Sequence, residues 1–577
     1  MFHWQEGRIA SLRTRSAATI GLSRHDRDTR SDHARPARQK LPQLLDRLAM
    51  ADPTARPTHR LRDIFAGGLL LLLAGCGGAA ATVPADTLVR INEDEVKSLD
   101  PHKISDLTSI RVAGDLYEGL TRPRGDGGVE PGLAERWQAS PDGLTWTFTL
   151  RPGLLFSDGA PLDARTMKTS LDRLLAPATA APNATLFGVV SGTAAPDART
   201  LVLTLSAPFP AILELLAHPS AAALPLHQIA RDPSGWTRAP AASGPYRLAR
   251  WQLHSRMDLA ANPAYWDAAN VRSAKLTFLP IDDDQTAIRR FRAGEAHTLG
   301  DFPASQLAPL RARLGDAVRI APYRGSYYWV FNTRKPPFDD ARVRRALSMA
   351  VDRERIVERL LGQGNPPAYG LVPPGLGGYG AAVRPAWADW PMSRRLAEAR
   401  RLLAAAGYGP DRPLIVEARF NSDVDHRRIG IALASFWTPL GVRLRLFNTE
   451  ATLHFAALKT GDFTLARSGW IGDLSAAENF LAIHSSDAGA LNYSGYRSAA
   501  YDRALAAGLA EPAPARRNAR LAQAEAILVA DAPVLPIYFY VSKNLVSPCL
   551  AGWQDNLANQ HADRRLAVRP GCRAPKG

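Results

Sequence analysis

The chain has 577 residues, of which 46% are hydrophobic and 22% charged, and a formal net charge of +16. This length exceeds that of one compact domain, and the hydrophobic fraction is ordinary for a globular protein. The positive charge is spread thinly, mostly as Arg, without a basic run interleaved with aromatics after the N-terminal region, which excludes a typical nucleic-acid-binding protein. We interpret the positive charge as favouring attraction to anionic membrane surfaces or to acidic ligands.

A lipoprotein export signal is predicted at residues 50–75. Three arginines precede an uncharged, apolar run at 64–74, and the sequence L-A-G-C ends at Cys76. The run is too short to span a bilayer, which takes roughly 20 residues. We therefore expect cleavage before Cys76 and lipidation of its thiol, which would anchor the protein to a membrane. A buried segment with a chance cysteine is the alternative.

Two further segments flank this signal. Residues 1–49 resemble no export signal, and Met50 could start a normal one. We interpret 1–49 as the result of a mis-set start codon, with a disordered basic extension as the alternative. Residues 76–86 are mostly small, so we predict a flexible tether there.

Strand and helix patterns alternate after the tether, as in an α/β protein. Trp146, Phe148 and Leu150 alternate with Thr, between turns at Asp142-Gly143 and Asp158-Gly159. No repeat of solenoid period is visible. Further strands are predicted at 201–205, 276–279, 414–420 and 534–541, and helices at 164–174, 340–361 (with Asp339 or Asp340 as N-cap), 393–406 and 515–530.

Motifs of common enzymes are missing from the sequence. It contains no H-E-x-x-H, C-x-x-C, Walker A or G-x-S-x-G pattern. Gly375–Gly380 fits G-x-G-x-x-G but follows two prolines and not a strand, so we predict a flexible loop. The 13 histidines lack metal-ligand spacing. We therefore predict no catalytic residues, no metal and no cofactor.

Several short blocks occur in a characteristic order. They are Ser98–Lys103, Leu116–Leu120, Trp137–Met167, Ser243–Tyr246, Asn262–Trp266, Lys335–Arg344, Pro367–Gly370 and Ala466–Trp470. Through these blocks the chain resembles, from Leu88 to Val568, the extracellular solute-binding proteins of peptide and nickel ABC importers (family 5). The oligopeptide- and murein-peptide-binding proteins are the nearest branch.

The resemblance implies a type II periplasmic-binding-protein fold, with two lobes, a hinge and an extra middle domain. It implies a lipid-anchored, monomeric periplasmic protein that binds peptides, is not an enzyme, and delivers its ligand to the permease and ATPase of an ABC importer. The implied division of the chain is lobe I at 87–117, 221–323 and 541–572, domain II at 118–220, and lobe III at 324–540.

The resemblance also implies a peptide site. A buried α-ammonium needs a carboxylate, and Asp473 holds the matching position, three residues after Trp470. Gly469, Trp470 and Ile471 would supply backbone groups and an aromatic wall. The remaining implied contacts are Arg467 and His426 for the C-terminal end of longer peptides, Tyr328 near the cleft, and Ser105 and Leu107 from the other lobe.

Each of these residues has a structural alternative. Asp473 could be a helix N-cap, Trp470 and Tyr328 could pack in the core, Arg467 could form an ion pair within a lobe, and His426 could be an exposed loop residue. Four positions depart from the family pattern in losing a polar or aromatic group: Ser105, Val330, Ala451 and Leu458. We therefore expect a narrower ligand, such as a short or modified cell-wall peptide. The rivals are a nickel chelate, an opine, an oligosaccharide, an exported hydrolase and a peptide-sensing adaptor or chaperone.

The two cysteines that follow Cys76 have two alternative states. An exported, oxidising compartment favours a bridge between Cys549 and Cys572, and two free thiols are the alternative. In the relatives a bridge often lies near the binding site. The corresponding positions here are Gly325 and Ile471, so the resemblance implies that this bridge is absent.

Overall fold

The computed structural model describes residues 86–572. The predicted export signal, the lipidation site Cys76, the extension 1–49 and nearly all of the tether lie outside these residues. Within 86–572 no helix is both long enough and apolar enough to cross a membrane.

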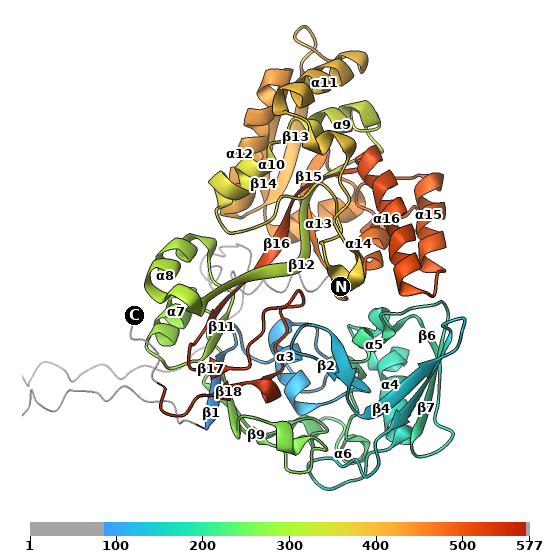
Figure 1. Cartoon of the computed structure of the whole chain (residues 1–577), viewed down its shortest axis with the longest axis vertical. Helices are drawn as coiled ribbons and strands as arrows, with labels where there is room; N and C mark the ends of the chain where they lie inside the picture. Colours follow the sequence, from blue (N-terminus) through green and yellow to red (C-terminus); the bar gives the residue numbers. More distant parts are fainter. Residues whose placement is uncertain (1–85, 573–577) are drawn as a thin grey trace, which may run out of the picture. The chain divides into compact units, whose positions relative to one another are not determined.

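A mixed sheet of ten strands is the largest element (Figure 1), with the order β14-β13-β15-β12-β16-β11-β1-β10-β9-β8. Strand β12 pairs antiparallel with β15 and β16, and β16 pairs antiparallel with β11. The long pair β12–β16 therefore joins two groups of strands into one sheet. The strands are β1 (Thr87–Ile91), β8 (Tyr246–Gln252), β9 (Arg256–Ala261), β10 (Lys275–Leu279), β11 (Thr298–Gly300), β12 (Val318–Phe331), β13 (Leu414–Asn421), β14 (Val442–Thr449), β15 (Leu465–Ile471) and β16 (Val534–Val546).

Successive residues of β12 serve two different hydrophobic cores, because side chains alternate between the faces of a strand. Tyr327 and Trp329 belong to one cluster, and Tyr328 and Val330 to another. The first cluster lies under α9 (Ala341–Met349), α11 (Met392–Ala405) and α12 (Val424–Trp437). The second lies under α13 (Ala451–Thr460), α14 (Glu478–Leu481), α15 (Ala499–Leu509) and α16 (Pro514–Asp531).

The same division occurs at β1. Leu88 packs in a cluster with α3 (Leu107–Leu116), whereas Val89 and Ile91 pack in a cluster with α7 (Asp284–Arg292) and α8 (Leu307–Leu314). Both groups of strands therefore have helices on both faces. An inner strand such as β1 is buried along its whole length, whereas the edge strands β8 and β14 are mostly exposed or half-buried.

A separate four-stranded antiparallel sheet has the order β4-β5-β7-β6. Phe148 and Leu150 of β5 are fully buried beneath α4, while Trp146 is half-buried. Asp163 caps α4 by accepting a hydrogen bond from the Thr166 amide. The elements of this region and the remaining short ones are β2 (Thr121–Pro123), β3 (Val129–Pro131), β4 (Ala134–Ala139), β5 (Thr145–Leu150), β6 (Val190–Ala194), β7 (Thr200–Leu205), β17 (Leu550–Ala551), β18 (Ala567–Val568), α4 (Ala164–Leu175), α5 (Ile212–Leu215) and α6 (Leu226–Arg231).

Most predicted elements are present. The prediction of one continuous helix at 340–361 was wrong, because the segment forms two helical stretches with a break between them. Asp340 caps α9, which ends at Met349. Asp352 then accepts a hydrogen bond from the Arg355 amide and caps a new start, α10 (Arg353–Arg355), which continues as a π-helix, Ile356–Leu361. The fully buried Arg353 donates to the carbonyls of Ser348, Val351, Ala368 and Pro536. Arg353 thus links the interruption to Ala368 and to Pro536 of β16, and these contacts stabilise the break.

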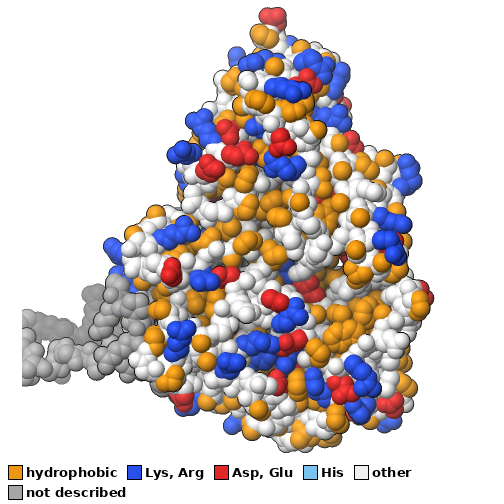
Figure 2. Space-filling model, viewed as in Figure 1, with side chains coloured by type: hydrophobic (Ala, Val, Ile, Leu, Met, Phe, Trp, Pro, Cys, Tyr) orange, Lys and Arg blue, Asp and Glu red, His pale blue; other side chains and the backbone are white. Residues whose placement is uncertain are grey.

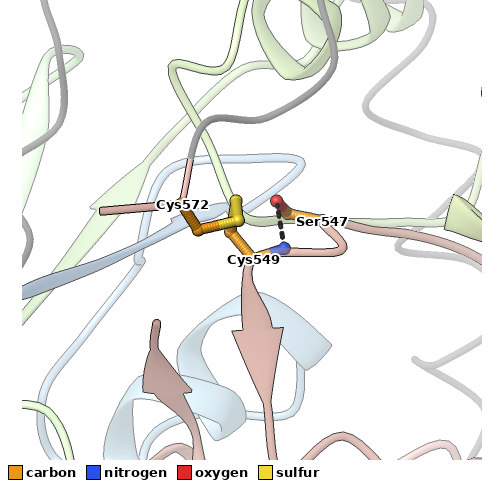
Figure 3. Close-up of a disulfide and its surroundings, with 3 residues drawn as sticks. All are labelled: Ser547, Cys549 and Cys572. Carbon is orange, nitrogen blue, oxygen red and sulfur yellow. Dashed lines mark hydrogen bonds between the residues drawn. A yellow bond between two sulfur atoms is a disulfide. The ribbon is translucent and has the colours of Figure 1, made fainter. Parts of the chain in front are cut away.

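A disulfide joins Cys549 and Cys572 (Figure 3), whose Cα atoms are 5.5 Å apart. The Ser547 hydroxyl accepts a hydrogen bond from the Cys549 amide. Inside the loop that the bond closes, Asp563 pairs with Arg90 of β1 at 2.6 Å, and both side chains are buried. The bridge therefore ties the C-terminal segment to the central sheet.

The double variant Cys549→Ser/Cys572→Ser should lose about 2–4 kcal/mol of unfolding free energy, because the unfolded chain regains the freedom that the closed loop removes. Urea unfolding measures this change. Wild type treated with a reducing agent serves as the control and should match the variant. A variant as stable as the oxidised protein would contradict the prediction.

Candidate functional site

An aromatic group surrounds Arg467 where β12, β15 and β16 run side by side. Arg467 and Gly469 lie opposite Trp329 and Tyr327 in the β12–β15 register, so they share one face of the sheet. The Arg467 guanidinium lies 4.9 Å from the centre of the Tyr327 ring and donates to the Tyr540 hydroxyl at 3.0 Å. Tyr327 also stacks on Tyr538, with ring centres 4.6 Å apart. These contacts fix the guanidinium in one position.

The charge of Arg467 is not matched by an acidic partner. Its side chain is buried, its Nη1 donates to Asn421 at 3.4 Å, and its Nε has no hydrogen-bond partner. Among residues 86–572 no carboxylate lies within ion-pair distance of it. Burial opposes the charge of Arg467, but the neighbouring tyrosine hydroxyls and Asp423 outweigh it and raise the pKa of Arg467 above its usual value. The guanidinium therefore stays charged and is suited to an anionic group from outside the chain.

His426, in the first turn of α12, lies against the same group. Its Nδ1 is 3.4 Å from the Tyr327 hydroxyl and 3.2 Å from Asp423. Burial holds the pKa of His426 well below its usual range, and the nearby charge of Arg467 lowers it further. The ring is therefore neutral at pH 7 and offers a hydrogen bond without adding charge.

The strand β15 continues into a loop that carries Asp473. Asn479 of α14 accepts hydrogen bonds from the Trp470 indole at 3.2 Å and from the Asp473 amide at 3.1 Å. Trp470 is half-buried and packs at the edge of the second cluster of β12. Asn479 therefore sets the shape of this loop.

Asp473 carries the opposite charge to Arg467, and one atom of its carboxylate also lacks a partner within 86–572. The side chain is half-buried, and its Oδ2 is shielded from solvent without a hydrogen-bond partner among the described residues. Burial raises the pKa of Asp473, and the charge of Arg324 opposes this shift. A cation that reached Oδ2 would supply the missing partner.

Two glycines leave room for the side chain of Tyr540. A Cβ at Gly469 would lie 2.9 Å from the Tyr540 hydroxyl, and one at Gly325 would lie 2.8 Å from the Tyr540 ring. Gly325 pairs with Ile471 in the β12–β15 register. The positions of the bridge that the relatives often carry therefore do lie opposite each other, and Tyr540 occupies the space beside them.

The remaining predicted site residues lie elsewhere. Tyr328 is buried on the opposite face of β12, with its ring 6.1 Å from that of His484. Ser105 and Leu107, both half-buried, flank the N-cap Asp106 of α3. No hydrogen bond between described residues joins these three side chains to Arg467 or Asp473.

Three of the departures from the family pattern are core residues. Val330 and Leu458 are buried in the same hydrophobic cluster, and Ala451 is the buried first residue of α13. Apolar residues suit these places because no polar partner is needed there. Fewer polar groups are thus available to a ligand than the family pattern implies.

Residues 86–572 also contain scattered titratable side chains and the glycine-rich segment. No group of three or more His, Cys, Asp or Glu side chains is arranged to hold a metal ion there. Gly375–Gly380 forms a loop around a short 3₁₀ turn, Leu376–Gly378. On the face shown in Figure 2, Lys and Arg side chains are dispersed and many lie beside Asp or Glu.

Sequence reasoning missed Tyr327, Tyr540, Asn421 and Asn479. The period-two alternation of a strand already assigns Tyr327 and Tyr328 to opposite faces, but it does not say which face meets the site. Asn421 and Tyr540 come from strands far apart in the chain. No local pattern brings them together.

Comparisons with known proteins identify the family. The model of bacterial extracellular solute-binding proteins, family 5 (middle), matches residues 128–492. The chain is 36% identical over 537 residues to the periplasmic oligopeptide-binding protein OppA of Salmonella typhimurium, covering 88% of this chain and 98% of OppA. It is 36% identical over 506 residues to the periplasmic murein peptide-binding protein MppA of Escherichia coli, covering 83% and 93%.

The structure is similar to the unliganded open form of MppA, with a TM-score of 0.76 at 32% identity, covering 84% of this chain and 98% of that one. The chain belongs to family 5 of the bacterial extracellular solute-binding proteins. The predicted family and its type II fold are confirmed. The relatives are named as periplasmic binding proteins, not as enzymes.

His454 of α13 supports the site from behind, because its Nε2 donates to the Arg467 carbonyl at 2.9 Å. Burial lowers the pKa of His454 from 6.5 to about 4, although this hydrogen bond opposes the shift. The folded protein thus requires the neutral ring, whereas the unfolded chain takes up a proton below pH 6.5.

Lowering the pH from 7 to 5 should therefore cost the wild type about 2 kcal/mol of unfolding free energy through His454. In His454→Gln the amide can still donate to Arg467 but does not titrate. The stability advantage of the wild type over this variant should shrink by that amount, as measured by urea unfolding at the two pH values. An advantage independent of pH would contradict the assignment.

Proposed function

We propose that this protein captures a peptide by its two charged ends and delivers it to an ABC importer. One observation carries the proposal: Arg467 on β15 and Asp473 in the loop that follows are opposite charges, each lacking an ionic partner among the described residues. A peptide is a zwitterion whose ammonium suits Asp473 and whose carboxylate suits Arg467 and the neutral His426. Relatives named for binding oligopeptides and murein peptides support this assignment.

The backbone of such a ligand has matching groups nearby. We assign the contacts with the ligand backbone to the exit of β15, at Gly469, Trp470 and Ile471. Main-chain pairing with an extended peptide does not depend on the side chains of the peptide. Ser105 and Leu107 would meet the ligand from the other lobe, and Tyr328 would act by packing behind the strand. The two charged ends of the peptide thus provide the affinity, and the spaces that hold the side chains of the peptide provide the selectivity.

Capture would follow from hinge closure. We assign lobe I to 87–117, 221–323 and 541–572, domain II to 118–220 and lobe III to 324–540, so that β12 and β16 cross between the lobes. The separate hydrophobic clusters on either side of this pair support the division. A ligand that touches both lobes favours the closed state by its extra affinity for that state.

We infer a narrower ligand range than general oligopeptide binding. Leu458 and Val330 lie in the core and offer no charge to a ligand. A short or modified peptide, such as a cell-wall peptide, fits the few polar anchors that remain. The protein has no catalytic role in this proposal, and it acts as a monomer anchored to the membrane through lipidated Cys76.

Native mass spectrometry of the protein purified from its host tests the proposal. A bound peptide, released and sequenced, would support it and identify the ligand, and the mass of the intact chain would report lipidation of Cys76. An empty protein whose melting temperature is unchanged by a panel of peptides would contradict peptide capture. A bound nickel chelate, opine or oligosaccharide would reassign the ligand class.

Asp473→Asn should weaken the binding of peptides with a free amino terminus by about 1–3 kcal/mol, the scale of a lost buried charged contact. The N-acetylated forms of the same peptides should bind wild type and variant alike, since they carry no ammonium. Isothermal titration calorimetry measures both affinities. An equal loss for free and acetylated peptides would remove Asp473 as the ammonium anchor.

A further inference from the structure

A second cation, Arg324, lies beside the proposed ammonium anchor. The β12–β16 register shifts between Pro322 and Ser326, so Arg324 falls in an irregular part of β12. Its carbonyl accepts a hydrogen bond at 2.8 Å from the amide of Gly472, the residue before Asp473. Bulges of this kind re-aim side chains near binding sites.

Glu214 holds the guanidinium of Arg324. It comes from α5, distant in sequence, and its Oε1 is 2.5 Å from Arg324 Nη1. Its other oxygen, Oε2, accepts the Ser475 amide at 2.7 Å, two residues after Asp473. Arg324 Nη1 also donates to the Ser475 hydroxyl at 3.3 Å. Both charged side chains are largely buried, with 7% and 21% exposure.

This arrangement removes a competitor from the site. Arg324 is close enough to act electrostatically on Asp473, whose Oδ2 has no hydrogen-bond partner among the described residues. The hydrogen bonds of Arg324 to Gly472 and Ser475, the residues on either side of Asp473 and Leu474, place it beside this carboxylate. Without Glu214, its guanidinium would be released to form an internal ion pair with Asp473. Such a pair would have to be broken before a ligand ammonium could bind, which would lower the apparent affinity.

We infer that Glu214 is a positioning residue for ligand binding: by holding Arg324, it keeps the carboxylate of Asp473 available for the ammonium of the ligand. The inference rests on the proposed role of Asp473. It adds that the anchor depends on a carboxylate from α5 that makes no contact with the ligand.

Calorimetry with tetra-alanine and N-acetyl-tetra-alanine tests the inference on the full chain. Glu214→Gln should bind tetra-alanine about 10- to 100-fold more weakly than wild type, because Arg324 then competes for Asp473. The double variant Glu214→Gln/Arg324→Gln should recover most of this loss, and binding of the acetylated peptide should change little in either variant. Glu135→Gln is the matched control, since Glu135 also pairs with arginine but on β4.

A double variant that binds as weakly as Glu214→Gln would overturn the inference and leave Glu214 as a structural bridge only. A second measurement needs no ligand. Asp473→Asn should lower the melting temperature more in the Glu214→Gln background than in wild type, because only there does Arg324 pair with Asp473. Equal shifts would also overturn the inference.

The two measurements separate the inference from the proposed function. If wild type does not bind tetra-alanine but the melting temperatures show the expected difference, peptide capture of this probe fails while the restraint of Arg324 by Glu214 stands. If wild type binds tetra-alanine and the rescue is absent, peptide capture stands and the role of Glu214 falls.

Discussion

The antiparallel pairing of β12 with β16 is the constraint on which the rest of the structure depends. These two strands lie at the centre of the ten-stranded sheet and connect its two groups of strands. They also carry Tyr327, Tyr538 and Tyr540, which enclose Arg467. This strand pair therefore both joins the two groups of strands and holds the aromatic side chains around Arg467.

A second feature of the structure is that two charged side chains, Arg467 and Asp473, form no ion pair within the described residues. Other buried arginines are matched within the chain, as Arg517 is by Glu478 and Arg353 by four carbonyls. Arg467 instead donates to the Asn421 amide oxygen and the Tyr540 hydroxyl, and Asp473 Oδ2 has no hydrogen-bond partner among residues 86–572. An unpartnered buried group lowers the stability of the folded protein. At a binding site, the ligand supplies the missing partner and the group then contributes to affinity.

The cost of burying a charge also explains the apolar residues at positions where the family pattern predicts polar ones. Val330 and Leu458 complete a hydrophobic cluster under α13–α16, so no desolvated charge has to be matched there. Arg324 and Glu214 form a largely buried ion pair, and Glu214 also accepts the Ser475 amide in the loop that follows Asp473.

The sequence by itself determined the family, the order of the elements and the residues of the β15 block, because short motifs and local periodicity are encoded by neighbours in the chain. It also indicated an N-cap at Asp339 or Asp340, which depends on a few adjacent residues, and the structure has the cap at Asp340. It failed at 340–361, where hydrogen bonds from Arg353 to distant carbonyls support a break. Only the tertiary structure decided which face of β12 meets Arg467 and which distant side chains, Tyr540, Asn421 and Glu214, complete the site. Those contacts form between strands and helices far apart in sequence, so no local pattern contains them.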